Sequence, residues 1–233
     1  MYTLHIGNKN YSSWSLRPWI LMTELRIPFT ERLHLFGPTF AAKAEAKSPA
    51  GLVPCLHDGR RIVWDSIAIA EYLADRHPGV WPSDADARAW ARSAAAEMHS
   101  GFAMLREVCS MSCGIRVRLH SLPEGLERNV VRLEELWHDG LERFGGPFLA
   151  GASFGAVDAF FCPVAFRVQS YGLDLPPQAG AYAKRLLQLP GMRRWYEAAL
   201  AEPWRDPPHE DAIPAYGKVL DDLRVVAETG VSA

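Results

Sequence analysis

The stretch at residues 52–72, LVPCLHDGRRIVWDSIAIAEY, constrains the fold more than any other part of the chain. Two apolar runs flank Asp58-Gly59, a dipeptide typical of a two-residue hairpin turn because both residues tolerate a positive φ. We therefore predict strands at residues 52–57 and 61–64. A helix is then expected to begin at Asp65-Ser66.

Pro54 is unusual inside the first of these strands, because proline donates no ladder hydrogen bond. A cis bond between Val53 and Pro54 would resolve this conflict by turning the neighbouring backbone groups outward. On the other side of the hairpin, Asp65-Ser66 offers a hydroxyl, free N–H groups and the positive end of a helix dipole to a carboxylate. An exposed backbone edge beside such a helix start predicts a site for an acidic, peptide-like ligand.

This order of Val-Pro, hairpin and acid-Ser helix start resembles the glutathione-binding half of the glutathione S-transferases. The resemblance implies that glutathione is a co-substrate, and that Val53, next to Pro54, pairs by its backbone with the cysteinyl part of glutathione. It implies further that Asp65 and Ser66 bind the γ-glutamyl end. Lys43, upstream of this stretch, is a candidate for binding the glycyl carboxylate of glutathione, with an exposed surface charge as the alternative.

Residues 1–77 predict, in order, a strand, a helix, a strand, a short helix, a hairpin and a helix, which is a thioredoxin-like α/β layout. The proline and glycine content of residues 77–82 indicates a linker. After the linker no strand pattern returns, and apolar residues at helical spacing predict an all-helical second domain at residues 84–233. Within it we expect a proline-rich extension at residues 203–214 and a last helix at residues 216–226.

An α/β half followed by a helical half again resembles the glutathione S-transferases. Gly155 and Asp158 stand where that family has a Ser/Thr-x-x-Asp capping box, and glycine at an N-cap costs only a few tenths of a kcal/mol. The segment LPGMRRW at residues 189–195 is similar to the family's Pro-then-Trp helix start. The resemblance spans residues 1–204 and implies a homodimer formed through the first domain and the long helices of the second.

A glutathione transferase needs a group that stabilises the bound thiolate, and Ser12 and Ser13 lie at the start of the first predicted helix. The segment SSWSLR resembles the Ser-Ser-Cys-Ser-x-Arg signature of the zeta class, the maleylacetoacetate isomerases. That resemblance implies Ser12 as the partner of the thiol, with Ser13 as its close neighbour. Trp14 replaces the zeta-class cysteine. Two alternatives stay open: the serines only cap the helix, or Tyr11 supplies the hydroxyl.

The pocket for the electrophile is expected between the two domains. Its predicted walls are Trp14 and the helix that carries Met98, Phe102 and Arg106, although apolar residues at helical spacing also fit simple core packing. Arg17, one turn into the first helix, suits a carboxylate-bearing substrate; a solvated or interface arginine is the alternative.

Composition excludes several other classes of protein. A formal charge of −2 in 233 residues gives no reason to expect nucleic acid or a membrane as partner. No apolar run reaches the roughly 18 residues of a membrane span. The first residues lack the basic-then-apolar pattern of a signal peptide, so we expect a cytoplasmic protein. Cys109 and Cys113 share a helix face, but without further ligands at zinc-site spacing we expect no metal.

The leading hypothesis is an enzyme, a glutathione transferase that adds the thiolate to a small electrophile. One alternative is a glutathione-dependent cis-trans isomerase of the maleylacetoacetate type, which uses the same thiolate. Another is a non-catalytic binding protein of the glutathione transferase fold. A disulfide reductase of the cysteine-bearing type is least favoured, because no cysteine lies at residues 7–19.

Overall fold

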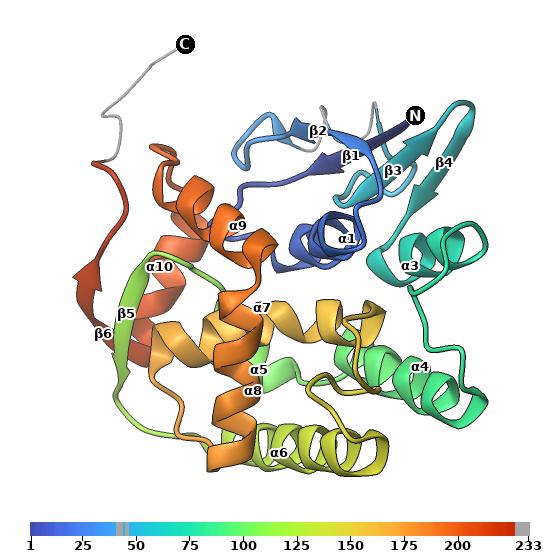
Figure 1. Ribbon diagram of the computed structural model, residues 1–233. Helices are drawn as coiled ribbons and strands as arrows, with labels where there is room; N and C mark the ends of the chain where they lie inside the picture. Colours follow the sequence, from blue (N-terminus) through green and yellow to red (C-terminus); the bar gives the residue numbers. More distant parts are fainter. Residues whose placement is uncertain (41–43, 45–46, 227–233) are drawn as a thin grey trace.

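The computed structural model describes residues 1–40, 44 and 47–226. Its first part contains β1 (Tyr2–Ile6), α1 (Ser13–Glu24), β2 (Phe29–Leu33), β3 (Cys55–Asp58), β4 (Arg61–Trp64) and α3 (Ser66–Ala74). The strands form a sheet of order β2-β1-β3-β4, in which β1 and β2 are parallel and the other pairs antiparallel. Helices α1 and α3 lie on the side of the sheet that faces the rest of the molecule (Figure 1). This arrangement confirms the predicted thioredoxin-like layout.

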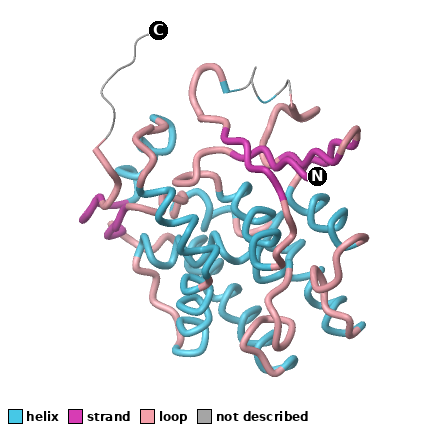
Figure 2. The backbone as a smooth tube through the Cα atoms, turned by 45° about the horizontal axis from the view of Figure 1, so that its top comes forward, coloured by secondary structure: helices cyan, strands magenta, loops and turns pink. Residues whose placement is uncertain are grey.

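The second part is mainly helical, as predicted. It contains α4 (Ala85–Ser100), α5 (Ala103–Val108), α6 (Glu124–Phe144), α7 (Ala156–Tyr171), α8 (Pro177–Gln188), α9 (Pro190–Leu200) and α10 (Pro207–Tyr216). Helix α7 packs against α1, α4 and α8, and nearly all of its side chains are buried. Figure 2 shows the strands of the first part gathered at one end of the molecule, with most of the helices beneath them.

The hairpin differs in detail from the prediction. Strand β3 begins at Cys55, and Asp58 is its last residue, paired with Arg61. The turn is therefore Gly59-Arg60, and not Asp58-Gly59, with a φ of 59° at Gly59. Asp58 is retained in the strand, where its carboxylate accepts a hydrogen bond from the Tyr72 hydroxyl at 2.7 Å. The expected cis peptide bond between residues 53 and 54 is present.

Strands do return in the second part, so the prediction of a helix at residues 216–226 is wrong. Strand β5 (Ile115–Leu119) pairs antiparallel with β6 (Gly217–Asp222). In β5 the buried Ile115 and Val117 alternate with arginines. This alternation is the pattern of a half-buried strand and was visible in the sequence. The expected proline-rich extension is also largely helical, because Pro207 occupies the first turn of α10, where proline is tolerated.

The helix expected to continue through Phe102 is broken there. Helix α4 ends at Ser100, and Phe102 has a φ of 55° before α5 begins. The apolar spacing continues across the break because both helices pack on one core.

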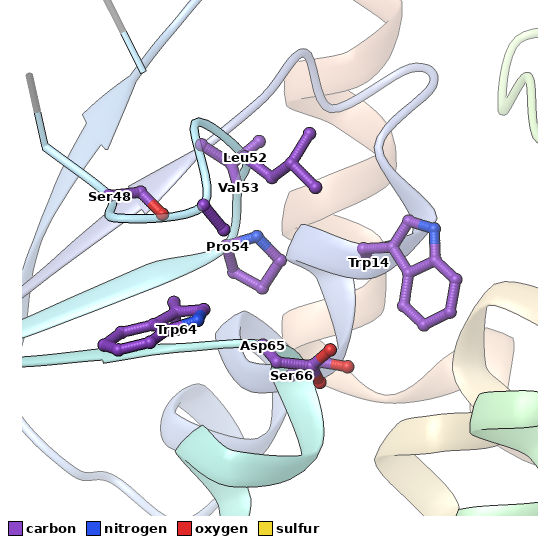
Figure 3. A pocket seen from close by; sticks show the side chains of 9 residues that line it. Trp14, Ser48, Leu52, Val53, Pro54, Trp64, Asp65 and Ser66 are labelled. Carbon is purple, nitrogen blue, oxygen red and sulfur yellow. The ribbon is translucent and has the colours of Figure 1, made fainter. Parts of the chain in front are cut away.

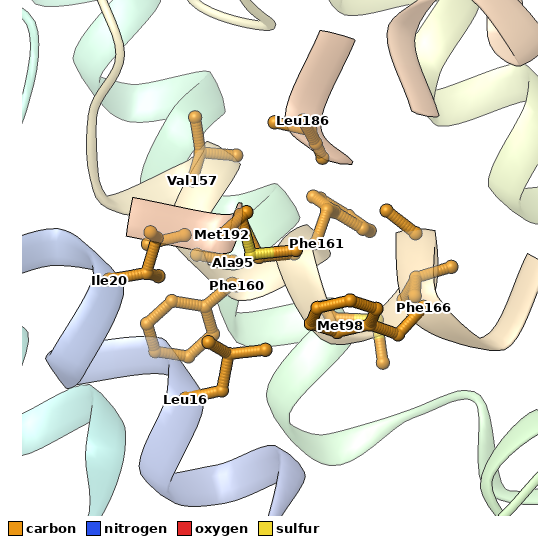
Figure 4. Close-up of a cluster of buried hydrophobic side chains, with 14 of the residues drawn as sticks. Leu16, Ile20, Ala95, Met98, Val157, Phe160, Phe161, Phe166, Leu186 and Met192 are labelled. Atoms are coloured by element: carbon orange, nitrogen blue, oxygen red, sulfur yellow. The ribbon is translucent and has the colours of Figure 1, made fainter. Parts of the chain in front are cut away.

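A single hydrophobic core cluster runs through both parts of the molecule. Figure 4 shows Leu16 and Ile20 of α1 beside Phe160 of α7, with Met98 of α4 and Met192 of α9 in the same cluster. These five side chains are at most 1% exposed. Helix α1 is therefore buried between the sheet and α7, and its N-terminus is fixed by packing on both sides.

Candidate functional site

A cavity of about 360 Å³ lies beside the hairpin (Figure 3). The described residues that line it come from the start of α1, the segment before β3, and the junction of β4 with α3: Trp14, Ser48, Ala50, Leu52, Val53, Pro54, Trp64, Asp65 and Ser66. We call it the first cavity. It brings together four of the predicted glutathione-binding residues, Val53, Pro54, Asp65 and Ser66.

The start of α3 presents polar groups to this cavity. Asp65 has a φ of 72°, and its carboxylate caps the helix by accepting a hydrogen bond from the N–H of Ile67 at 3.0 Å. The Ser66 hydroxyl is buried and has no hydrogen-bond partner among the described residues. A buried hydroxyl without a partner costs stability, and at a helix N-terminus it is suited to bind an anion.

Val53 presents backbone groups on the opposite side of the same cavity. Within the described part of the chain, its N–H and C=O have no backbone hydrogen-bond partner. Figure 3 shows Val53 and Pro54 across the cavity from Asp65 and Ser66. An extended peptide could therefore pair with Val53 while its charged end reaches the start of α3.

A second cavity, also about 360 Å³, adjoins the first, since Trp14, Leu52 and Val53 line both. The other described residues that line it are Tyr11, Ser12, Ser13, Phe36, Phe40, Arg106, Ser110, Met111, Arg167 and His209. Ser12 and Ser13 therefore lie on the second cavity, while the predicted glutathione-binding residues surround the first.

The serines at the start of α1 differ in their hydrogen bonds. Ser12 is the N-cap, and its Oγ lies 2.7 Å from Ser15 Oγ and 3.4 Å from the Ser15 N–H. Ser15 is itself fully buried and accepts a hydrogen bond from the Gly7 N–H at 3.1 Å. The Ser13 hydroxyl has no hydrogen-bond partner among the described residues. Ser12 thus combines a capping role with an open face on the cavity, and Ser13 is free to bind a ligand.

Tyr11 is much less suited to bind a thiolate. Its hydroxyl donates to Glu210 at 2.7 Å and accepts from Arg224 at 3.1 Å. Burial and the Glu210 hydrogen bond raise the pKa of Tyr11 well above its usual value. Its proton is therefore already bound by a carboxylate of α10.

Trp14 is surrounded by cationic and polar groups. The Arg17 guanidinium lies 4.1 Å from the centroid of the Trp14 ring, and the His99 ring packs edge-on to Trp14 at 5.2 Å. His99 lies 3.4 Å from Arg17 and 3.5 Å from the Asp65 carboxylate. Burial lowers the pKa of His99, and the nearby Arg17 lowers it further, while Asp65 opposes the shift.

Of the remaining predicted site residues, some are buried in the core and one lines a cavity. Met98 and Phe102 are buried in the core and line neither cavity. Arg17 is also buried, behind Trp14. Arg106 does line the second cavity. Lys43 lies outside the described residues.

From the sequence we did not identify Phe36, Phe40, Arg167 and His209 as cavity residues. They come from a loop, from α7 and from α10, which only the tertiary fold brings together. Phe36 stacks on His209 with ring centroids 5.7 Å apart, so the loop and α10 form one side of the cavity. Arg167 could have been found from its charge, because Asp158 is the only other charged residue in the mostly apolar sequence of helix α7.

Other kinds of site are not evident in the described part of the chain. No group of three or more His, Cys, Asp or Glu side chains there could hold a metal ion. The thiols of Cys109 and Cys113 are buried in the core. No described helix is both long and apolar enough to cross a membrane.

A thioredoxin-like domain with a cis-proline beside an acid-Ser helix start, followed by a helical domain, defines the glutathione transferase fold class. Residues 11–76 match the family model of the glutathione S-transferase N-terminal domain. The match assigns residues 11–76 to the N-terminal domain of that family, which confirms the family resemblance inferred from the sequence; the resemblance to the zeta class stays a prediction. No curated protein matches the chain significantly.

Solved structures agree with this assignment over most of the chain. A glutathione transferase homologue from Burkholderia gl BGR1, with bound glutathione, is 22% identical, covers 85% of this chain and 97% of its own, and gives a TM-score of 0.63. The theta-class enzyme of Xanthomonas axonopodis pv. citri, with glutathione bound, is 24% identical over 84% and 96%, with a TM-score of 0.62. A diazinon-metabolizing glutathione S-transferase of the silkworm Bombyx mori is 17% identical over 85% and 97%, with a TM-score of 0.69. At these identities the likeness establishes the fold.

Proposed function

We propose that the protein is a glutathione transferase, which binds glutathione in the first cavity and transfers its thiolate to an electrophile in the second. The observation that carries the proposal is the junction of the two cavities. On one side lie the backbone of Val53 and the hydroxyl of Ser66, which have no hydrogen-bond partners among the described residues. On the other lie the hydroxyls of Ser12 and Ser13 at the start of α1.

The γ-glutamyl and cysteinyl parts of glutathione each have complementary groups in this arrangement. The α-carboxylate of the γ-glutamyl group would accept hydrogen bonds from the Ser66 hydroxyl and from N–H groups at the start of α3. The ammonium group would lie against the Asp65 carboxylate. The cysteinyl backbone would pair with Val53 and direct the sulfur toward the start of α1. The homologues crystallised with glutathione support this assignment of the ligand.

The start of α1 can supply the energy that the chemistry needs. Lowering the pKa of a thiol from about 8.5 by about two units requires roughly 2.7 kcal/mol in favour of the thiolate. A helix N-terminus contributes about 0.3–1 kcal/mol, and a hydroxyl that donates to the thiolate contributes about 1.5–3 kcal/mol. The two together contribute about 1.8–4 kcal/mol, a range that includes the energy required, so one serine hydroxyl, from Ser12 or Ser13, can serve with the helix dipole.

The proposal also includes a homodimer and a cytoplasmic location. Neither is needed for the chemistry, because all residues assigned to glutathione and to the thiolate belong to one chain. The alternative isomerase would use the same thiolate.

The test is an ultraviolet titration of protein-bound glutathione, following the thiolate band from pH 5 to 9. We expect a pKa of the bound thiol about two units below the free value of about 8.5. Removal of the hydroxyl that binds the thiolate, by Ser12→Ala or Ser13→Ala, should raise the pKa of the bound thiol most of the way back to the free value. Ser93→Ala is the matched control, because Ser93 is an exposed serine of α4 that lies on neither cavity.

The outcomes separate the functional classes. A shifted thiol pKa that only one serine variant abolishes assigns the thiolate partner. Glutathione binding with an unshifted thiol pKa would instead identify a non-catalytic binding protein. Absence of glutathione binding would overturn the proposal and leave only the fold.

A further inference from the structure

Three arginines converge behind and beside the second cavity. Arg106 of α5 and Arg167 of α7 line the cavity, and Arg17 of α1 lies behind Trp14. We call these three residues the arginine cluster. Arg17 and Arg167 are 1% and 4% exposed, and the positive charges of Arg106 and Arg167 both act on Arg17.

The charges of the arginine cluster are not neutralised by acids. Among the described residues, none of the three forms an ion pair with a carboxylate. Their partners among the described residues are neutral: Arg167 donates to Cys109 O, Arg106 donates to Gly101 O, and Arg17 lies beside His99. Nε of Arg17 and Nε of Arg167 have no partner at all within the described chain.

Another buried arginine of this protein shows the usual arrangement. The Arg224 side chain is 3% exposed, and it binds the Glu210 carboxylate through two hydrogen bonds of 2.6 and 2.9 Å. It also binds Asp222. Buried charges in proteins are normally paired in this way, because an unpaired buried charge costs several kcal/mol. Among the described residues, the arginine cluster therefore has no carboxylate like those that neutralise Arg224.

The second cavity itself has the composition of an anion site with an aromatic wall. No Asp or Glu occurs among the described residues that line it, whereas Trp14, Phe36 and Phe40 do. Burial lowers the pKa of Arg17 to about 9 and that of Arg167 to about 10, as expected for cations without a counter-charge. Asp65 acts on Arg17 only from beyond ion-pair distance.

We propose that the second cavity binds an electrophile that carries a carboxylate, with Arg106 and Arg167 binding the anion and the aromatic side chains contacting its unsaturated part. This inference rests on the proposed function, since it names the class of acceptor for the same thiolate. Arg17 contributes through its charge and through its contact with Trp14.

A matched pair of probes tests the charge of the acceptor: 4-chloro-3-nitrobenzoate and its methyl ester. In either reaction the glutathione thiolate forms a carbon–sulfur bond at the ring carbon that bears chlorine. The carbon–chlorine bond breaks, chloride leaves with the electron pair, and the thiol proton is released to solvent. The two probes share the reacting ring and differ in the charge that the arginine cluster would bind; the ester also carries one methyl group and activates the ring more strongly, so affinity and not rate is compared first.

Binding is measured first, without glutathione, from the quenching of tryptophan fluorescence by each probe. We expect the dissociation constant of the acid to be about tenfold lower than that of the ester. A difference of this size is what one or two charge-assisted hydrogen bonds to the carboxylate contribute. Arg106→Met should remove this preference and leave the affinity for the ester within about twofold, while Arg106→Lys should restore part of it. Arg118→Met, on the exposed face of β5, is the control for loss of one positive charge.

Arg167→Met provides a second variant in case the Arg106 substitution disturbs α5. Turnover is then measured with glutathione and corrected for the uncatalysed rate with each probe. Equal affinity for the acid and the ester in the unmodified protein would overturn the anion inference, whatever the turnover. An acid preference without turnover of either probe would support the anion site and count against the transferase proposal. The two failures are therefore distinguishable.

Discussion

At the residue scale, the most informative group is the Ser66 hydroxyl, because no described residue forms a hydrogen bond with it. It is buried at the start of α3 and lines the first cavity. Such a group lowers the stability of the folded chain, and it contributes favourably only when a ligand accepts its hydrogen bond. The sequence identified this position correctly as part of the helix start, from the order of residues around it alone.

We predict opposite effects of Ser66→Ala on stability and on binding. Removal of the unpaired hydroxyl should leave the free energy of unfolding unchanged or raise it by up to about 1 kcal/mol. The dissociation constant for glutathione should rise about tenfold, because one hydrogen bond to a carboxylate is lost. Urea unfolding and isothermal titration calorimetry measure the two effects, with Ser93→Ala as control. An unchanged affinity for glutathione would remove Ser66 from the site.

The residues that sequence reasoning found and those it missed differ in a physical way. Val53, Pro54, Asp65 and Ser66 lie in one short stretch, where turn, cis-proline and helix-start chemistry are local properties. Arg167 and its neighbours on the second cavity come from separate segments. No local rule joins such segments, because their proximity depends on how α7 packs against α1.

At the element scale, the start of α7 explains why Gly155 replaces the expected hydroxyl residue. The carboxylate of Asp158 accepts from the Gly155 N–H and from the Leu149 N–H, each at 3.0 Å. The Val80 carbonyl accepts from Ala156 at 2.8 Å, and a Cβ on Gly155 would lie only 3.1 Å from that carbonyl oxygen. The close approach of the linker to the helix start therefore disfavours a larger residue, while Asp158 retains the cap.

The strands carry a group of histidines that makes the sheet sensitive to pH. His5 of β1 is hydrogen-bonded to His34 at 2.8 Å, and its ring lies 4.5 Å from that of His57 on β3. Burial lowers the pKa of His5 to about 4, and the neighbouring His57, His34, Lys47 and Arg32 lower it in the same direction. The folded protein therefore binds fewer protons than the unfolded chain between pH 6.5 and 4.

We predict that acid destabilises the protein in this window. Stability is fully present above pH 6.5 and decreases as the pH falls toward 4, by about 1–3 kcal/mol for His5 alone. The measurement is the free energy of unfolding in urea at pH 7 and pH 4.5. The difference between the two values should shrink in His5→Gln and stay unchanged in His120→Gln, a control at an exposed histidine. An equal difference in all three proteins would contradict the prediction.

The β5–β6 pair shows where element prediction failed and why. Strand β6 is exposed along most of its length and pairs with a strand far away in the sequence. A strand of this kind is defined by its partner and has little hydrophobic pattern of its own. The helices around the core, in contrast, have buried faces that their apolar spacing predicts well.

At the scale of the whole molecule, the two parts depend on each other. Leu16, Trp19 and Ile20 of α1 are buried against the helical part, and the rings of Trp19 and Trp195 lie 5.1 Å apart. The loop before α1 is fixed by the segment that follows α9. The Glu202 carboxylate accepts hydrogen bonds from the backbone N–H groups of residues 9 and 10, at 2.7 and 3.1 Å.

We therefore predict that a fragment of residues 1–77 does not fold alone, although it contains the complete sheet. Exposure of Leu16, Trp19 and Ile20 to water would cost roughly 5–9 kcal/mol, at about 1.5–3 kcal/mol for each large apolar side chain. A domain of this size has a total stability of only about 5–15 kcal/mol or less. Circular dichroism of the fragment should show no cooperative thermal transition, whereas the full chain should show one. A cooperative transition in the fragment, together with glutathione binding, would mean that the start of α1 is positioned without α7. The site for the thiolate would then belong to the first part alone.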